Sequence, residues 1–238
     1  MKLIIDKRGK KRLCEDDVVH TDLGIVDLKD VEDGVVKSHL GHEFRVVAPR
    51  LLDIYEKLPR TGSLILRKDI GTILANTGLK TGDVVVDAGT GTGALAVVLA
   101  SIVMPTGMVY TYEIREDFAE IAKKNIAKAG LSDYCAVKQR DIQEGIDENP
   151  DVITLDLAEP WNLTDKAYDA LKSGGAISAY TPYIEHARDV NQGFKAAGFN
   201  EVRTIETIER EMEFRKQGSR PKTRMPSHTA YLTFARKY

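Results

Sequence analysis

The sequence is poor in the residues that build disulfide frameworks or metal sites. Its 238 residues include only two cysteines, Cys14 and Cys135, and they form no disulfide framework and no metal-ligand pattern. No apolar run approaches the roughly 20 residues that a membrane-spanning helix needs. The apolar stretch near the N-terminus is too short for a secretory signal. We therefore expect a protein without a membrane span or a bound metal, located in a reducing cytoplasm.

An excess of charge of one sign is also missing. The formal net charge is −2, and charged residues at 29% and hydrophobic residues at 42% are ordinary for a globular chain with a real core. The cations are unevenly spread, however. One basic segment, residues 2–12, has a single acid, and another, residues 215–224, has none; their cations are Lys2, Lys7, Arg8, Lys10, Lys11 and Arg12, and Arg215, Lys216, Arg220, Lys222 and Arg224. Each segment is either solvated surface or a patch that binds a polyanion.

The hydrophobic pattern changes along the chain and predicts two domains. Residues 1–50 contain short β-like runs separated by glycine and charged turns, and we expect a small β domain there. Residues 51–238 form the second domain, which opens with a helical linker region, 51–80. From residue 81 onward strands alternate with helices, which predicts an α/β fold with a parallel sheet wound on both faces. The last two strand-like runs have no helix between them, so we expect an antiparallel hairpin at one edge.

A glycine-rich turn follows the first strand of the α/β region. In DAGTGTGALA, Gly89, Gly91 and Gly93 come directly after a buried strand and at the start of a helix. Glycines permit positive φ and let the backbone approach a ligand closely, while the helix N-terminus offers free N–H groups. With Ala94 the run also satisfies the G-x-G-x-x-A dinucleotide pattern. The motif alone is weak, since a tight turn that binds nothing is an alternative.

Two acidic residues after later strands strengthen the case for a ligand. Glu113 closes the next strand at the spacing where an acid binds ribose hydroxyls, and Asp141 follows the strand after that, where a carboxylate could accept from an adenine amino group. Either acid could instead be a helix cap or a surface residue. Because all three features end adjacent strands, we favour a ligand that contains adenosine. S-adenosylmethionine fits better than a nicotinamide cofactor, because it has no pyrophosphate and no second catalytic domain follows.

Asp156 raises a separate question, because an apolar strand runs straight into it in DVITLDLAEPW, residues 151–161. Buried strands avoid unpaired carboxylates, since removing the charge from water is costly. One reading is that Asp156 caps the helix that begins near Asn162, although Asn162 and Thr164 are closer candidates for that position. The other reading places the carboxyl group beside the atom that accepts a methyl group.

The order of parts resembles the class I S-adenosylmethionine-dependent methyltransferases. The whole chain resembles more closely the tRNA (adenine-N1)-methyltransferase family, which methylates adenine in the T-loop. The most specific stretches are DLAEPW (156–161), AYTP (179–182) and SRPKTRMPSHTAYLTFARK (219–237). The chain departs from the family pattern at Ala158, where proline is usual, at Ala230, where glycine is usual, and at His186, where glutamine is frequent. The resemblance implies a Rossmann-like seven-stranded methyltransferase sheet, tRNA as partner and a homotetramer.

The resemblance also implies roles for individual residues in cofactor binding. Gly89, Thr90, Gly91, Thr92 and Gly93 would hold S-adenosylmethionine together with Glu113, Asp141 and Asp156. Phe118 falls where this family contacts the cofactor, although it could equally be a core aromatic on an amphipathic helix. Residues 61–71 would cover the other side of the ligand.

A second set of residues is implied for the tRNA. N1 lies on the Watson–Crick edge, so the target adenine must be flipped out and stacked in a pocket. Candidate stacking residues are Trp161, Tyr180 and Tyr183, each of which could instead be a packing residue. Near the C-terminal end, the residues expected to contact tRNA are Arg220, Lys222, Arg224 and His228.

In this chemistry Asp156 is the catalytic residue. As N1 attacks the sulfonium methyl group, positive charge moves onto the purine, and a fixed carboxylate that accepts from the 6-amino group would orient the base and favour that charge. Two alternatives remain. Protein-L-isoaspartate O-methyltransferases share the glycine loop and the acids, but a carboxylate acceptor would be repelled by Asp156. A non-catalytic tRNA-binding subunit would keep the fold, but its glycine loop would be degraded.

Overall fold

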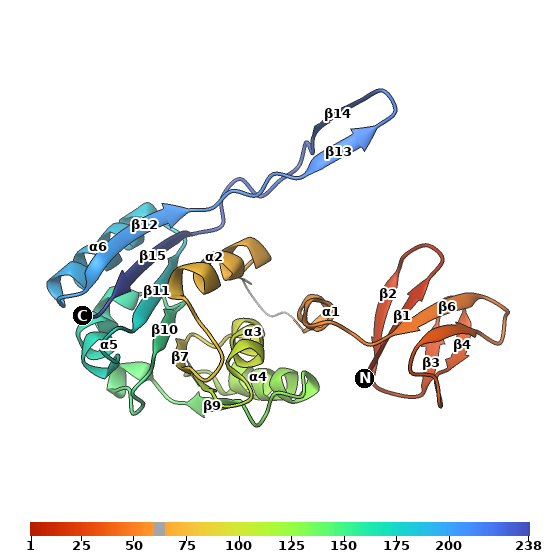
Figure 1. Ribbon diagram of the computed structural model, residues 1–238, viewed down its shortest axis with the longest axis horizontal. Coiled ribbons are helices and arrows are strands. Elements are labelled where there is room, and N and C mark those ends of the chain that lie inside the picture. The colour runs from red at the N-terminus through yellow and green to blue at the C-terminus, as the bar shows by residue number, and fades with distance from the viewer. Residues whose placement is uncertain (60–64) are drawn as a thin grey trace. The chain divides into compact units, whose positions relative to one another are not determined.

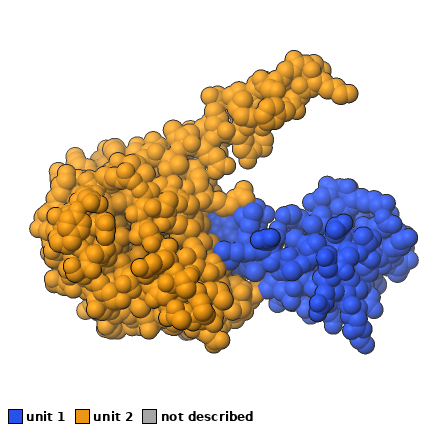
Figure 2. All heavy atoms as spheres, in the orientation of Figure 1, with its two compact units in different colours: residues 1–58 blue, residues 59–238 orange. Residues whose placement is uncertain are grey.

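The computed structural model describes residues 1–59 and 65–238, which divide into two compact units, Met1–Leu58 and Pro59–Tyr238 (Figure 2). The division falls after the short helix α1, Leu51–Lys57, whereas the sequence pattern suggested residue 50. An ion pair explains why α1 groups with the first unit. The Lys11 ammonium in strand β2 (Lys11–Cys14) lies 2.7 Å from the carboxyl group of Asp53, in the first turn of α1.

The first unit is built from six short strands. Four of them form an antiparallel sheet in the order β2-β1-β6-β5, and two form a separate hairpin, β3-β4. One apolar cluster, which includes Ile4, Val26, Phe44 and Val46, fills the interior. The strands are β1 (Lys2–Asp6), β2 (Lys11–Cys14), β3 (Val18–Thr21), β4 (Gly24–Asp27), β5 (Gly34–Lys37) and β6 (Glu43–Val47). The expectation of a β structure before the helical region is therefore confirmed.

The basic segment 2–12 is largely neutralised inside its own unit. Arg8 contacts both Asp6 and Asp22, at 2.6 Å and 2.9 Å. Lys2, Lys7, Lys10 and Lys11 also lie within ion-pair distance of acidic groups of the first unit, and Arg12 donates to the backbone carbonyl of His20. Such exposed pairs add little stability individually. They do cancel the local charge, so the structure favours solvated surface over a polyanion-binding patch for this segment.

The second unit contains the seven-stranded sheet that the family resemblance implies, in the order β12-β15-β11-β10-β7-β8-β9 (Figure 1). Strand β15 is antiparallel to both of its neighbours, β11 and β12, and the remaining pairs are parallel. The predicted antiparallel pair at one edge is therefore present. The strands are β7 (Val84–Ala88), β8 (Met108–Glu113), β9 (Cys135–Gln139), β10 (Val152–Leu155), β11 (Ala176–Thr181), β12 (Asn200–Glu206) and β15 (Tyr231–Arg236).

The strand order reverses between β7 and β10. The chain proceeds from β7 to β8 and β9 on one side, then returns to β10 and β11 on the other. Because parallel crossovers are right-handed, the helices of the two halves lie on opposite faces of the sheet. The helices are α2 (Arg67–Thr77), α3 (Ala94–Val103), α4 (Glu116–Lys128), α5 (Thr164–Ala170) and α6 (Ile184–Ala196). A reversal of this kind opens a crevice at the carboxyl ends of the strands.

The basic segment between β12 and β15 contains a ribbon that the sequence reading did not anticipate. Strands β13 (Met212–Arg215) and β14 (Gly218–Pro221) pair only with each other (Figure 1). Strand β13 alternates apolar and charged residues over only four positions and β14 does not alternate at all, so the hydrophobic signal that sequence reading depends on is too short here. Separately, no helix in the described ranges is long and apolar enough to cross a bilayer.

Candidate functional site

The crevice at the strand reversal holds a pocket of about 750 Å³. It lies where β7, β8, β9 and β10 end, and it gathers residues from the loops that follow all four strands. Among the residues proposed from the sequence, it is lined by Gly89, Gly91, Glu113, Phe118, Asp141 and Asp156. Side chains that the sequence reading did not single out complete the wall, chiefly Tyr112, Ile114, Arg115, Arg140, Ile142, Leu157, Glu159 and Asn162.

The glycine loop requires glycine at two positions for steric reasons. Gly89 has φ +84°, and a Cβ there would lie 1.9 Å from the backbone carbonyl oxygen of Asp156. Gly93 has φ +79° at the N-cap of α3, and a Cβ would lie 3.1 Å from the Cβ of Ala122. The loop is thus pressed against both β10 and α4, so any side chain at Gly89 would displace the chain that carries Asp156.

Glu113 ties the glycine loop to the end of β8. The side chain is buried, and its two oxygens accept hydrogen bonds from the backbone N–H groups of Gly91 and Arg115, each at 3.0 Å. A carboxylate can accept about four hydrogen bonds, so this pair leaves capacity for ligand hydroxyls.

Asp141 combines the two readings that the sequence left open. One carboxyl oxygen accepts from the backbone N–H of Gln143 at 2.8 Å, which caps the 3₁₀ turn η1 (Ile142–Glu144). The residue also lines the pocket, so its second oxygen remains available there. Nearby, Phe118 is half-buried, and the guanidinium carbon of Arg115 lies 3.9 Å from the centre of its ring.

Asp156 has no partner in the part of the chain that the structure describes. Its backbone N–H donates to the carbonyl of Ala88 at 2.8 Å, but no group hydrogen-bonds or pairs with its carboxyl. The following 3₁₀ turn η2 (Pro160–Leu163) has Glu159 at its N-cap, so Asp156 is not a helix cap. Burial, and secondly the charge of Asp87, raise the pKa of Asp156 to about 7. The carboxyl group is costly to ionise, and Asp156 lines the pocket.

Asp87 was not among the predicted site residues, although its position was visible in the sequence. It is a charged residue inside the buried strand VVVDA, and its side chain is only 2% exposed. Thr154 and Thr111 donate to its two carboxyl oxygens at 2.6 and 2.7 Å. The pKa of Asp87 is raised, first by burial and also by the charge of Glu113, and the two hydrogen bonds only partly offset that rise.

The threonines of the glycine loop do not line the pocket. Thr90 and Thr92 are buried beneath it. The Thr90 hydroxyl lies 2.5 Å from that of Thr111, and the backbone carbonyl of Thr92 accepts from the buried amide of Asn125 at 2.8 Å. They therefore hold the loop to β8 and α4, and Asn125 is a further residue that the sequence reading missed.

The aromatic residues proposed for base stacking lie outside the pocket lining. Trp161 packs half-buried against the core, and its ring meets that of His186 edge-on with centroids 5.0 Å apart. Tyr183 is 61% exposed and meets the other side of His186 at 5.2 Å. Tyr180 is half-buried on β11. Their stacking role stays a prediction.

The C-terminal candidates also lie outside the pocket lining, and three of the four have partners in the protein. His228 contacts Glu206 and the carbonyl of Pro182, both at 2.7 Å, and these hydrogen bonds raise its pKa. On the β13–β14 ribbon, Arg220 lies 3.8 Å from Glu213, and Arg215 pairs with the same carboxylate. Beside it Lys222 pairs with Glu211, while Arg224 is exposed.

The segment 61–71 falls partly outside the described residues, which omit 60–64. From Ile65 onward it leads into α2, and residues 65–71 do not line the pocket.

No group of three or more histidine, cysteine, aspartate or glutamate side chains in the described ranges is arranged to hold a metal.

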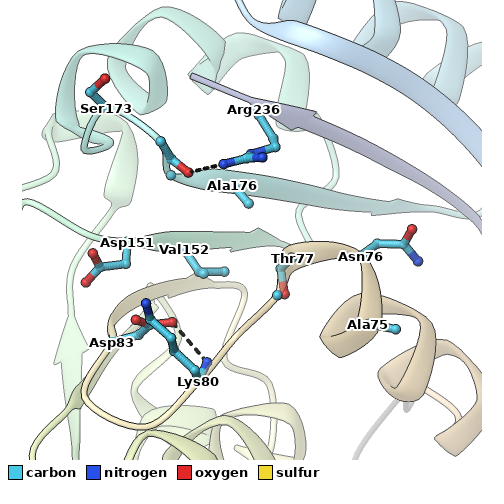
Figure 3. A pocket seen from close by; sticks show the side chains of 13 residues that line it. Ala75, Asn76, Thr77, Lys80, Asp83, Asp151, Val152, Ser173, Ala176 and Arg236 are labelled. Carbon is cyan, nitrogen blue, oxygen red and sulfur yellow. Dashed lines mark hydrogen bonds between the residues drawn. The ribbon is translucent and has the colours of Figure 1, made fainter. Parts of the chain in front are cut away.

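A second hollow of about 490 Å³ lies at the opposite edge of the sheet, where β7, β10 and β11 begin (Figure 3). Its two carboxyl groups and the Arg236 guanidinium are bonded to the protein. Asp151 accepts from Lys172 at 2.7 Å and from the backbone N–H of Val84 at 2.9 Å. Arg236 donates to the carbonyl of Gly174 at 2.9 Å. Asp83 also accepts from the backbone N–H of Lys80, so neither carboxyl group of this hollow is unpartnered as Asp156 is in the crevice.

Comparison with known proteins agrees with the geometry of the crevice. Residues 47–219 match the family model described as tRNA methyltransferase complex GCD14 subunit. The chain is 43% identical over 265 aligned residues, covering 99% of this chain and 94% of the relative, to tRNA (adenine(57)-N(1)/adenine(58)-N(1))-methyltransferase TrmI of Methanocaldococcus jannaschii. It is 30% identical to tRNA (adenine(58)-N(1))-methyltransferase TrmI of Thermus thermophilus, covering 99% and 96% of the two chains.

Solved structures resemble the whole chain as well. One is described as a SAM-dependent O-methyltransferase from Thermotoga maritima, with a TM-score of 0.87, 33% identity, and coverage of 99% of this chain and 92% of that one. Another is tRNA (m1A58) methyltransferase TrmI from Aquifex aeolicus, with a TM-score of 0.79, 25% identity, and coverage of 100% and 96%.

Proposed function

Since the chain belongs to the family of the tRNA methyltransferase complex GCD14 subunit, we propose that it transfers a methyl group from S-adenosylmethionine to N1 of adenine in the T-loop of tRNA. The observation that carries this proposal is the partnerless Asp156 carboxyl at the strand reversal, with its pKa raised to about 7. The tRNA substrate implies a cytoplasmic enzyme.

The crevice residues suit S-adenosylmethionine. The glycine loop brings backbone close to the ligand without side chains, and Glu113 retains acceptor capacity for ribose hydroxyls. Asp141 can accept from the adenine amino group with its second oxygen. Two isoleucines that line the pocket offer apolar surface for the adenine ring. Ile114, which is 66% exposed, follows Glu113, and Ile142 follows Asp141.

Asp156 then acts on the target base. The cofactor supplies an electrophilic methyl group on sulfur. The Asp156 carboxylate accepts a hydrogen bond from the 6-amino group of the adenine, which orients N1 toward that methyl group. As N1 gains the methyl group the purine becomes cationic, and the fixed negative charge stabilises it. In the cationic product the 6-amino group loses a proton more easily. The Asp156 carboxylate, with a pKa near neutral pH, is suited to accept that proton.

The flipped adenine needs a surface to stack on. Tyr183, His186 and Trp161 form a chain of edge-to-face rings that begins two residues after β11 and reaches the turn after Asp156. Because Tyr183 is exposed and its neighbours fix its direction, it is the strongest candidate for a base or a neighbouring nucleotide. His186 packs against Tyr183, and Trp161 packs against His186.

Cations and an assembly surface complete the proposal. Arg220, Lys222 and Arg224 would meet tRNA phosphates, although the first two already have acidic neighbours on the ribbon.

The ribbon also exposes large apolar side chains, with Phe214 at 83%. An isolated two-stranded ribbon is marginally stable in water, so we propose that it is buried between copies of the chain in a homotetramer.

Two other functions are disfavoured by the site. One structural relative is named an O-methyltransferase. A carboxylate acceptor, such as an isoaspartyl group, would be repelled by the ionised Asp156 and by the negative charge of Asp87 beneath it. A non-catalytic subunit would not need the glycines that the loop keeps at positive φ beside an unpartnered acid.

The test is a direct assay with competing acceptors. An unmodified tRNA transcript and an isoaspartyl peptide are incubated separately with methyl-labelled S-adenosylmethionine, and the tRNA is digested to nucleosides. We expect label in 1-methyladenosine, and loss of that label when the T-loop adenines are replaced by guanine. Label in the peptide alone, or in another nucleoside, would refute the proposal.

A further inference from the structure

A row of polar side chains crosses the buried sheet directly beneath the crevice. Strand register places Thr111 of β8 beside Asp87 of β7, and Asp87 beside Thr154 of β10. All three are at most 2% exposed. Register partners in parallel strands point to the same face, so the three side chains meet there. A carboxyl group at this depth is costly to ionise and requires a reason.

The hydrogen bonds of this row lead from Asp87 to the glycine loop. The hydroxyl groups of Thr111 and Thr154 each donate to one oxygen of Asp87. A hydroxyl has a single proton, so Thr111 must accept at its own oxygen from Thr90, 2.5 Å away. The chain of donors therefore runs from Thr90, in the cofactor loop, through Thr111 to the carboxylate.

The same row also leads to Asp156. Side chains alternate along a strand, so Asp156, two residues beyond Thr154, continues on the face that holds Asp87. The backbone N–H of Asp156 is bonded to the carbonyl of Ala88, the neighbour of Asp87, which keeps the two aspartates close. Burial is the first cause of the raised pKa of Asp156 and the charge of Asp87 is the second.

Other charged groups around the crevice are directed elsewhere. Glu113 acts on Asp87 but is bonded to backbone N–H groups. Asp141 caps η1, and Glu159 accepts from Asn162. The guanidinium groups of Arg115 and Arg140 contact Asp117 and Asp147 respectively. Among the described residues, Asp87 is therefore the charge that acts on Asp156.

We propose that Asp87 is a positioning residue for methyl transfer: clamped by Thr111 and Thr154, it acts electrostatically on the Asp156 carboxyl group and is linked through Thr111 and Thr90 to the cofactor loop. The inference rests on the proposed function, in which Asp156 accepts from the target adenine. A neighbouring negative charge raises the pKa of Asp156 and so makes its carboxylate more basic. A more basic carboxylate accepts a stronger hydrogen bond from a proton donor. Through Thr111 and Thr90, the same charge holds the loop that approaches the cofactor.

The experiment compares pH–rate profiles of single-turnover tRNA methylation with calorimetric affinities for S-adenosylmethionine. In Asp87→Asn, an isosteric change, we expect the midpoint of the acidic limb to move down by about one pH unit, since one unit charge near a carboxyl group is removed. Ser178→Ala is the matched control. Ser178 is buried in the same row, in register with Thr154, and is not bonded to Asp87. Its profile should keep the wild-type midpoint.

Two threonine variants separate the two halves of the proposal and serve if Asp87→Asn does not fold. Thr154→Val and Thr111→Val each remove one donor that favours the ionised form of Asp87. Asp87 then repels the Asp156 charge less, so each variant should lower the midpoint, by less than Asp87→Asn does. Only Thr111→Val also disconnects Thr90, so only it should weaken cofactor affinity, by roughly three- to tenfold for one lost hydrogen bond.

The outcomes are distinguishable. If the wild-type protein methylates no tRNA adenine, the proposed function fails. If it does, and Asp87→Asn folds and binds cofactor with an unchanged midpoint, the role of Asp87 is overturned. Equal cofactor affinities in the two threonine variants would overturn the link to the glycine loop.

Discussion

One strand, β10, is flanked by two aspartates that meet opposite fates. Asp151 precedes it at the amino edge of the sheet and Asp156 follows it at the carboxyl edge, and each lines a pocket. Burial works to raise the pKa of Asp151, but the Lys172 ammonium and the Val84 N–H outweigh it, and the pKa is lowered. Asp156 has no such partners, and its pKa rises to about 7.

The difference between the two aspartates shows what distinguishes a structural carboxylate from a functional one. At the amino edge the burial of the Asp151 charge is compensated within the fold, by the Lys172 ammonium and a backbone N–H donor. At the carboxyl edge the cost of burial is left uncompensated, and only a ligand can offset it. The same residue type on the same strand thus stabilises the protein at one end and awaits a substrate at the other.

The largest expected effect comes from removing the unpartnered aspartate. Asp156→Ala should lower single-turnover methylation of tRNA by about 10²- to 10⁴-fold, because the base loses its orienting acceptor, and should leave S-adenosylmethionine binding intact. Quench-flow kinetics and calorimetry measure the two. An unchanged rate would remove Asp156 from the mechanism and erase the contrast with Asp151.

The second effect tests whether the carboxyl edge depends on close backbone contact. In Gly89→Ala the new Cβ would collide with the Asp156 carbonyl, so we expect S-adenosylmethionine affinity to fall by roughly 10- to 100-fold, matching 1–3 kcal/mol of backbone strain. Gly130→Ala is the control, since Gly130 also has positive φ but nothing within 4 Å. Similar cofactor affinities in both variants would contradict the close-approach argument.

A third prediction uses pH to distinguish the two aspartates. The ionised form of Asp156 is the active one, so the rate should be level above pH 7 and fall about tenfold per pH unit below it. A rate that stays level down to pH 5 would show that the carboxyl group ionises normally.

The same raised pKa has a consequence for stability. A carboxyl group whose pKa is higher in the folded state costs stability above its unfolded pKa, and the cost is complete above the folded pKa. Asp156→Asn should therefore be more stable than wild type at pH 8, and that gain should shrink as the pH falls through 7 toward 4. Denaturant unfolding at several pH values measures it.

The smallest effect is expected at the amino edge. Asp151→Asn should leave methylation kinetics unchanged and destabilise the protein by about 1 kcal/mol, since the ion pair with Lys172 is partly exposed. Because the pKa of Asp151 is lowered, this contribution is present at neutral pH and should vanish as the pH falls through the carboxyl range. Equilibrium unfolding at pH 7 and pH 3.5 checks both points. A loss of activity would mean that the two edges are not independent.

Sequence reading located the crevice residues well where the pattern is local. Glycines after a buried strand, and acids at the ends of successive strands, can be read from spacing, and the structure gathers Gly89, Glu113, Asp141 and Asp156 around one pocket. The surroundings of side chains whose neighbours come from other segments were harder to predict. The aromatic residues proposed for stacking do not line that pocket, and Arg220 and Lys222 meet Glu213 and Glu211 from the opposite side of the ribbon.

The sequence by itself determined the α/β order, the antiparallel strand pair and the chemical types that end each strand, because hydrophobic period and glycine placement are local properties. Only the tertiary structure decided that Asp151 is paired with Lys172 while the carboxyl group of Asp156 has no partner among the described residues. It also decided that Asp87 accepts hydrogen bonds from residues of the neighbouring strands. A carboxyl group's proton affinity depends on its burial and on charges a few ångströms away. Those neighbours come from other strands, so spacing along the chain does not reveal them.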